Sequence, residues 1–359
     1  MRFFYDRNHK MFTKSVILSV MIMLLAAPLS GCFSSDAMAD NVNHDFPDPD
    51  LRINHLQMKG THNSYHVEPI ISPTREYMYT HETLDVQAAD QGVRQFEIDV
   101  WWDPRGGLRV YHNQYDSGTT CPTFENCLEV LLEWSENNPS HHTTFVWIEP
   151  KDWLEQGLEI TTTIQISDLL GLIEHELTQF WPENKTITPK QIQGNYSDLG
   201  EALRIEGWPT IEGGKGKTIF ILLATGDMRQ IYMDDFYPNG AMFPMFTSLA
   251  DSPDHARGFF SVTDPVNFHS DIEDLVSSGY IVRTRADSGG EEADNNDTTR
   301  LIAALTSGAH SISTDYPSKV DGIDYWVEIP GGNPSRCNPI SAPPSCTSAF
   351  ISSVDQQIT

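Results

Sequence analysis

The sequence is poor in basic residues, with 23 Lys and Arg against 50 Asp and Glu among 359 residues and a formal net charge of −27. Proteins that bind nucleic acid need Lys and Arg against the phosphates, so this composition argues against that class. It argues equally against docking on anionic membranes through a basic patch. Hydrophobic residues still make up 39% of the chain and aromatic residues 10%, which excludes a wholly disordered protein.

Long apolar runs are also scarce, and the one that stands out covers residues 16–27. About a dozen apolar residues are too few to span a membrane comfortably, but they match the core of a signal peptide, and basic residues precede them. The run leads into Leu29-Ser30-Gly31-Cys32, which resembles the lipobox of bacterial lipoproteins, where the cysteine is lipidated and becomes the new N-terminus. We therefore expect residues 1–31 to be a lipoprotein signal peptide. The alternative is an ordinary signal peptide that is cut after Ala39.

Export would leave a lipid-anchored chain in the cell envelope of a bacterium, at the outer membrane or the cell surface. Phe33, the residue after the lipidated Cys32, is not an Asp, which favours outer-membrane sorting in an envelope with two membranes. Residues 32–50 are rich in Ser, Asp, Asn and Pro and predict a flexible tether. Residues 51–359 then form a single, monomeric domain. Loss of residues 1–31 changes the net charge from −27 to −30, because four basic residues and one acid are removed.

Cysteine is scarce as well, and the four that remain besides Cys32 fall into two local pairs. An even number of cysteines in an oxidising compartment predicts disulfides. The separations of six and nine residues do not match the two-to-four-residue spacing of common zinc sites, which is the competing interpretation. The predicted disulfides are Cys121–Cys127 and Cys337–Cys346.

Short β-rich runs alternate with helical stretches from residue 51 onward, which predicts an α/β fold with a parallel sheet and helices outside it. No glycine-rich nucleotide-binding fingerprint follows the first run, so a barrel of the TIM type is favoured over a dinucleotide-binding sheet. Seven barrel strands are recognisable and the eighth is not located. A further run at 108–111 predicts a hairpin arm. The strands are expected at 56–60, 93–100, 144–148, 218–223, 258–262, 280–284 and 310–314, and the main helices at 124–137, 166–180 and 294–307.

Polar residues stand at or near the ends of the first three strands. His62 follows the first strand, Glu97 and Asp99 lie on one face of the second, and Glu149 ends the third. His112 ends the hairpin arm. Active sites of such barrels lie at the carboxyl ends of the strands, so these five side chains are expected to converge there.

Three inward carboxylates repel one another unless a cation compensates them, and hard oxygen ligands suit Ca²⁺ or Mg²⁺ better than zinc. A histidine pair beside such a cation can donate and accept protons near neutral pH. Without a Ser or Cys nucleophile, this set of groups indicates phosphoester chemistry. The neighbouring histidines His141 and His142 are expected at the surface instead.

Six segments, taken in order, resemble the calcium-dependent phosphatidylinositol-specific phospholipase C family in its bacterial secreted branch. The resemblance spans roughly residues 51–320. The segments are Gly60-Thr61-His62-Asn63-Ser64-Tyr65, Glu97-Ile98-Asp99-Val100-Trp101, Val110-Tyr111-His112, Trp147-Ile148-Glu149-Pro150-Lys151, Arg283-Thr284-Arg285-Ala286-Asp287 and the run 307–317.

This resemblance implies a distorted TIM barrel that cleaves the glycerol–phosphate bond of a phosphoinositide through attack by the inositol 2-hydroxyl. His62 would stabilise the phosphate, His112 would protonate the leaving diacylglycerol, and Glu97 would take the hydroxyl proton. The remaining assignments are Ca²⁺ ligands at Asn63, Glu97, Asp99 and Glu149, and phosphate or head-group contacts at Lys151, Arg283 and Arg285.

Two other functions stay open at this point. The first is a glycerophosphodiester phosphodiesterase, which shares the barrel and a similar metal site. The motifs of that family are His-Arg-Gly after the first strand and His-Asp after the hairpin, whereas this chain has His62-Asn63 and His112-Asn113, which counts against it. A lipoprotein that binds calcium or a lipid head group without turnover is the second, and the histidine pair argues against it. Arg283 and Arg285 have a structural alternative too, as ion-pair partners of barrel carboxylates.

Overall fold

The computed structural model describes residues 51–151, 164–236, 245–247, 258–332, 334–347 and 351. The expected signal peptide, Cys32 and the tether lie outside these residues, so those expectations stay predictions. No helix within the described residues is long and apolar enough to cross a membrane.

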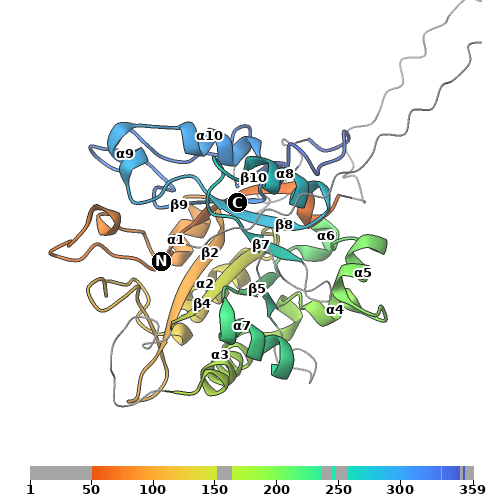
Figure 1. Cartoon of the computed structure of the whole chain (residues 1–359), viewed down its shortest axis with the longest axis horizontal. Helices are drawn as coiled ribbons and strands as arrows, with labels where there is room; N and C mark the ends of the chain where they lie inside the picture. The colour runs from red at the N-terminus through yellow and green to blue at the C-terminus, as the bar shows by residue number, and fades with distance from the viewer. Residues whose placement is uncertain are drawn as a thin grey trace, which may run out of the picture. The chain divides into compact units, whose positions relative to one another are not determined.

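Eight parallel strands form a nearly closed barrel and follow one another around it in chain order (Figure 1). This confirms the predicted fold class. No pairing joins β6 to β7 within the described residues, which stop at 247 and resume at 258. The barrel strands are β1 (Leu56–Thr61), β2 (Val93–Trp102), β4 (Thr144–Lys151), β5 (Thr218–Leu222), β6 (Phe246–Thr247), β7 (Phe259–Ser261), β8 (Ile281–Arg285) and β9 (Ser311–Thr314).

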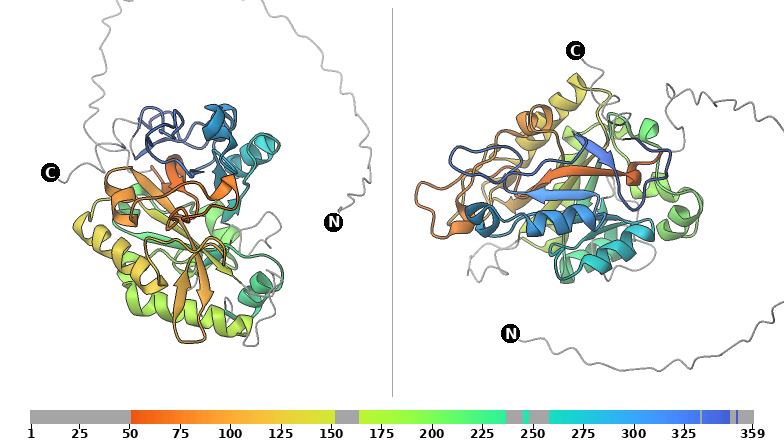
Figure 2. Two further views of the ribbon diagram at one scale, coloured as in Figure 1. Left: turned by 90° about the vertical axis from the view of Figure 1, so that its left-hand side faces the viewer. Right: turned by 90° about the horizontal axis from the view of Figure 1, so that it is seen from above.

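Two further strands extend the sheet at β1 and β2. The predicted hairpin arm is β3 (Leu108–Val110), which pairs antiparallel with the end of β2. β10 (Ser335–Cys337) pairs antiparallel with the first half of β1, which lies beside strands from the C-terminal part of the chain (Figure 2). The strand that the sequence did not reveal is β6, because two residues are too short for a recognisable β pattern.

Helices connect the strands on the outside of the barrel. α2 begins after Thr123, whose hydroxyl accepts the Asn126 amide at 3.1 Å, and it confirms the predicted 124–137 helix. The helices are α1 (Leu84–Ala89), α2 (Phe124–Asn137), α3 (Ile166–Phe180), α4 (Pro189–Gln193), α5 (Leu199–Ile205), α6 (Ile211–Gly214), α7 (Gly226–Ile231), α8 (His269–Ser277), α9 (Glu291–Asn295) and α10 (Thr299–Thr306), with 3₁₀ turns at Ile53–His55, Arg75–Tyr77 and Glu183–Lys185 and a π turn at Tyr232–Phe236.

The prediction of one helix over 294–307 was wrong, because two helices, α9 and α10, occupy this region. Asn296 between them adopts a left-handed conformation, φ +50°, which ends α9. The helix predicted over 166–180 is α3, with the same bounds.

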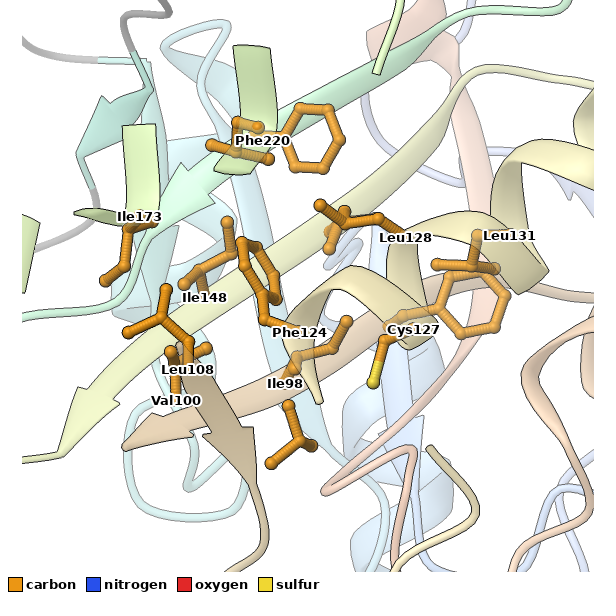
Figure 3. Packing of buried hydrophobic residues seen from close by; sticks show 14 of the residues in the cluster. Ile98, Val100, Leu108, Phe124, Cys127, Leu128, Leu131, Ile148, Ile173 and Phe220 are labelled. Atoms are coloured by element: carbon orange, nitrogen blue, oxygen red, sulfur yellow. The ribbon is translucent and has the colours of Figure 1, made fainter. Parts of the chain in front are cut away.

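The alternation of side chains along the strands separates two apolar layers. Outward residues of β2 and β4, such as Ile98 and Ile148, pack against α2 and α3 through Phe124, Leu128 and Ile173 (Figure 3). Inward residues form a second apolar cluster inside the barrel, which includes Phe145, Trp147, Ile219, Ile221, Phe259 and Ile281.

Both predicted disulfides are present, Cys121–Cys127 and Cys337–Cys346. The first joins the segment that precedes α2 to the first turns of that helix, and the second ties β10 to the C-terminal segment. The zinc interpretation of these cysteines is therefore wrong.

Candidate functional site

A polar floor replaces the apolar filling at the carboxyl ends of the strands. Residues that pair in register on neighbouring strands point to the same face of the sheet. Glu97 pairs with Trp147, whose side chain points into the barrel, and Arg283 pairs with Ser311. The same alternation therefore brings charged side chains to the barrel mouth. A cavity of about 270 Å³ lies there. Its lining includes His62, Glu97, Glu149, Arg283, Arg285, Thr225, Met228, Ser261 and Thr263.

His62 is held from both sides of its ring. Nδ1 lies 2.8 Å from an Asp315 carboxylate oxygen, and Nε2 lies 3.2 Å from Nη1 of Arg285, which can only donate. His62 is therefore neutral in this arrangement, with its proton on Nδ1. Burial and the neighbouring Arg285 lower the pKa of His62, against the opposing effect of Asp315.

Asp99 and Glu149 are cross-strand neighbours on β2 and β4, and Lys151 lies over both. The Lys151 ammonium is 3.1 Å from Asp99 and 2.5 Å from Glu149. Burial raises the pKa of Asp99 to about 6, with added repulsion from Glu97. Burial and Asp99 raise the pKa of Glu149 to about 7. Lys151 therefore compensates the two carboxylates only in part.

Glu97 has a different partner, because the Arg283 guanidinium hydrogen-bonds to its carboxylate in the fully buried interior. Burial alone would raise the pKa of Glu97, but Arg283 outweighs it and the pKa is lowered. In this structure Arg283 and Arg285 are therefore ion-pair partners of barrel carboxylates, which is the structural alternative stated above. Arg285 likewise donates to Asp315 at 2.9 Å.

Asn63 follows His62 in a left-handed conformation, φ +43°, which is uncommon for a residue with a side chain. Its backbone N–H donates to Glu97 Oε2 at 3.3 Å, so the residue lies against the carboxylate floor.

The residues present fit a hard cation. Three carboxylates and the Asn63 amide supply the oxygen donors that Ca²⁺ takes. Asp99 is fully buried and neither of its carboxylate oxygens has a hydrogen-bond partner of good geometry, although Lys151 lies nearby. As they stand, no three Asp, Glu, His or Cys side chains of the described residues are grouped closely enough to hold a metal. Loading would therefore require Lys151 to give way to the cation.

His112 follows β3 and does not line the cavity of about 270 Å³. Its Nδ1 lies 2.9 Å from Asp116, and the ring edge meets Tyr77 at a centroid distance of 5.3 Å. The expected convergence thus holds for His62, Glu97 and Glu149 around one cavity, while His112 stands to the side.

Sequence reasoning missed two carboxylates, Asp315 and Asp116, that hold the histidines. Asp315 lies two residues beyond Ser313 of β9, so its inward direction follows from the strand period, and this signal could have revealed it. The expectation that His141 and His142 lie at the surface was wrong. Both are buried, and His141 Nε2 lies 2.8 Å from the Ser135 hydroxyl of α2.

Comparison with known proteins identifies one family. The model of the family described as phosphoinositide phospholipase C, Ca²⁺-dependent, matches residues 51–114 and 105–339. No curated protein sequence matches the chain significantly.

Solved structures share the fold at low sequence identity. The chain is similar to a Ca²⁺-dependent phosphatidylinositol-specific phospholipase C from Streptomyces antibioticus, with a TM-score of 0.53, 17% identity, and coverage of 74% of this chain and 95% of that one. It is also similar to the calcium-dependent phosphoinositol-specific phospholipase C of a Pseudomonas species, with a TM-score of 0.53, 15% identity, and coverage of 76% and 94%. The myoinositol complex of the Pseudomonas enzyme gives a TM-score of 0.52, 16% identity, and coverage of 74% and 90%.

Proposed function

The chain belongs to the calcium-dependent phosphoinositide phospholipase C family, whose members are phosphoric diester hydrolases, and from this premise we propose how its residues divide the reaction. The observation that carries the proposal is the single cavity at the barrel mouth, where carboxylates, two arginines and a neutral histidine meet. Such a cavity suits a phosphate ester with a polyhydroxylated head group, because it offers cationic donors and carboxylate acceptors together.

Asn63, Glu97, Asp99 and Glu149 are proposed to hold Ca²⁺. Calcium bound there supplies positive charge at the phosphate and lowers the pKa of the attacking 2-hydroxyl. Arg283 keeps Glu97 ionised, which is the form that both a ligand and a proton acceptor need.

Arg285 is proposed to bind the phosphate oxygens, because it lines the cavity, and His62, which lines the same cavity, is proposed to donate to them through Nε2 once that nitrogen takes up a proton. Lys151 and Arg283 are the other proposed contacts to phosphate or head group. Once the substrate is bound, Glu97 takes the proton of the 2-hydroxyl, whose oxygen forms the new bond to phosphorus. The bond to the glycerol oxygen breaks, and His112 gives that oxygen its proton.

The rim of the barrel offers an apolar contact for a lipid surface. Ile70 and Ile71 are almost fully exposed on the loop between β1 and α1, and Tyr115 is exposed beside His112. Side chains of this size in water cost free energy that insertion into an interface recovers. We propose that this loop touches the membrane that carries the substrate. Lipidation of Cys32 is the proposed anchor, on the cell-envelope side of a bacterium, for a monomeric enzyme that does not bind nucleic acid.

The test measures the products of phosphatidylinositol vesicles incubated with the purified protein, in calcium and in excess chelator. Release of cyclic inositol phosphate only in calcium is expected. The His112→Ala variant should lose turnover by several orders of magnitude while binding calcium as before. His175→Ala, on the exposed face of α3, is the matched control and should retain activity.

Other outcomes would contradict the proposal. Glycerol phosphate as the product would favour a glycerophosphodiester phosphodiesterase on the same barrel. Absence of hydrolysis of any diester would favour a lipoprotein that binds calcium or lipid without turnover. Full activity of His112→Ala would refute the assignment of the proton donor.

A further inference from the structure

His112 is not the only histidine on Asp116. The Asp116 carboxylate is completely buried and accepts from His112 Nδ1 at 2.9 Å through Oδ2. His66, also completely buried, places Nε2 at 2.8 Å from Oδ1 and 2.9 Å from Oδ2 of the same group. One carboxylate therefore joins a histidine at the site to a histidine in the interior.

The backbone fixes this arrangement on both sides. Asn113 and Asp116 exchange two backbone hydrogen bonds of 3.1 Å, which sets Asp116 beside His112. The segment that follows Asp116 lies against the segment that contains His66, where Val67 N–H donates to the Gly118 carbonyl at 3.2 Å. A Cβ on Gly118 would lie 2.0 Å from the Val67 carbonyl oxygen, so only glycine permits this close approach.

His66 has a hydrogen-bond partner at each ring nitrogen. Nδ1 lies 3.0 Å from the backbone carbonyl of Tyr79, which can only accept. Nε2 faces the Asp116 carboxylate. Burial would raise the pKa of Asp116, but hydrogen bonds from His112 and His66 outweigh it and lower the pKa, so the group stays ionised and accepts here as well. Both ring nitrogens of His66 therefore face acceptors, and the ring fixes the Asp116 carboxylate from the interior side.

The same reasoning orients His112. Asn113 Nδ2 also lies 3.1 Å from His112 Nδ1, but this amide has the Tyr77 hydroxyl as an acceptor at 3.2 Å. The Nδ1 proton of His112 then goes to Asp116, and Nε2 is the nitrogen that can give a proton to the leaving group. The other titratable groups packed around the two rings are Tyr77, Tyr79 and His81.

We infer that Asp116 and His66 are positioning residues for the proton donor: Asp116 holds the His112 ring with Nε2 outward, and the buried His66 ring holds the Asp116 carboxylate in place. This inference rests on the proposed function, because His112 is the proton donor only there.

The direct test reads the ring nitrogens and needs no turnover. Two-bond ¹H–¹⁵N spectra of the ¹⁵N-histidine protein are expected to show the His112 ring with a proton on Nδ1, and Asp116→Asn should lose this signature. A His112 ring without a proton on Nδ1 would overturn the inference. Failure of the protein to hydrolyse phosphoinositides would refute the proposed function and leave this measurement intact.

Variants test the effect on His112. Asp116→Asn removes the negative charge beside His112, so the His112 titration, read by ¹H–¹³C spectra, should move down by about one to two pH units. The alkaline limb of kcat/KM should move with it, and kcat should fall at least tenfold. His66→Ala, which removes a donor to Asp116, should lower kcat, and His66→Gln, which keeps one, should restore most of it.

The matched control makes the same change at another buried histidine. His310 donates through Nε2 to the Asn54 carbonyl at the opposite end of β9 from Asp315. His310→Gln is expected to lower stability without moving the His112 titration. If Asp116→Asn lowers the rate but leaves the His112 titration where it is, or if His66→Gln is no more active than His66→Ala, the role of the pair is only structural and the inference is wrong.

Discussion

Asp99 provides a sharp test of the carboxylates at the barrel mouth, because it is a buried acid that Lys151 compensates only in part. It is completely buried, its oxygens have no hydrogen-bond partner of good geometry, and its pKa is raised from 3.8 to about 6. That shift corresponds to about 3 kcal/mol against the charged form. Because the folded pKa lies above the unfolded one, the destabilisation is absent below pH 3.8 and complete above pH 6.

Asp99→Asn removes the charge and keeps the volume, so the calcium-free protein at pH 8 should gain up to about 3 kcal/mol in the free energy of unfolding. Calcium should raise the stability of the wild type by about 2.7 kcal/mol at a hundredfold excess over its dissociation constant, and should no longer stabilise the variant. Activity should be lost. The assay is urea unfolding in chelator and in calcium, followed by tryptophan fluorescence.

Asp103→Asn is the matched control, since Asp103 is a buried acid whose oxygens accept from Arg105 at 3.1 Å and Arg109 at 3.0 Å, and these hydrogen bonds lower its pKa. This variant should lower the free energy of unfolding, because two arginines lose their acceptor, and should keep the calcium response. If Asp99→Asn destabilises the calcium-free protein as much as Asp103→Asn, or is still stabilised by calcium, the electrostatic argument fails.

Three further predictions address other parts of the molecule. Burial lowers the pKa of His310 to about 4, so the free energy of unfolding should fall as the pH drops from 6.5 to 4. His310→Gln should reduce that slope by about 1.4 kcal/mol per pH unit. An unchanged slope would show that His310 takes up its proton in the folded state. Gly118→Ala should lower activity at least tenfold by separating the Asp116 segment from Val67, whereas Gly171→Ala, in an open position of α3, should raise stability by about 1 kcal/mol; equal effects of the two would refute the close-approach argument. The double variant Ile70→Ser, Ile71→Ser should lose activity on vesicles but not on a soluble short-chain substrate, with the exposed Ile302→Ser as control; equal loss on both substrates would exclude a role at the interface.

Local patterns predicted the elements with strong periodicity. α3 has the expected bounds, and seven of the strands were located, because their short β-rich runs stand out between helical stretches. β6 was missed because two residues carry no period. His141 and His142 were misplaced because a loop rich in Pro, Ser and Asn resembles surface, whereas His141 in fact contacts Ser135 and the aromatic ring of Trp134 on the preceding helix α2.

The candidate site divides in the same way. Glu97, Asp99 and Glu149 were recognisable, since acids within apolar strands are costly unless they serve a purpose. Their partners were not, because the contact of Arg283 with Glu97 spans 186 residues and that of His62 with Asp315 spans 253.

The sequence by itself determined which side chains face the inside of the barrel, because the two-residue period of a strand is local, and it determined the disulfide pairs, because each pair is close along the chain. Only the tertiary structure decided which charge lies against which: Lys151 over Asp99 and Glu149, and Asp116 between two histidines. Those contacts depend on the register of neighbouring strands and on how two loops lie against each other. Both are settled by packing over the whole barrel.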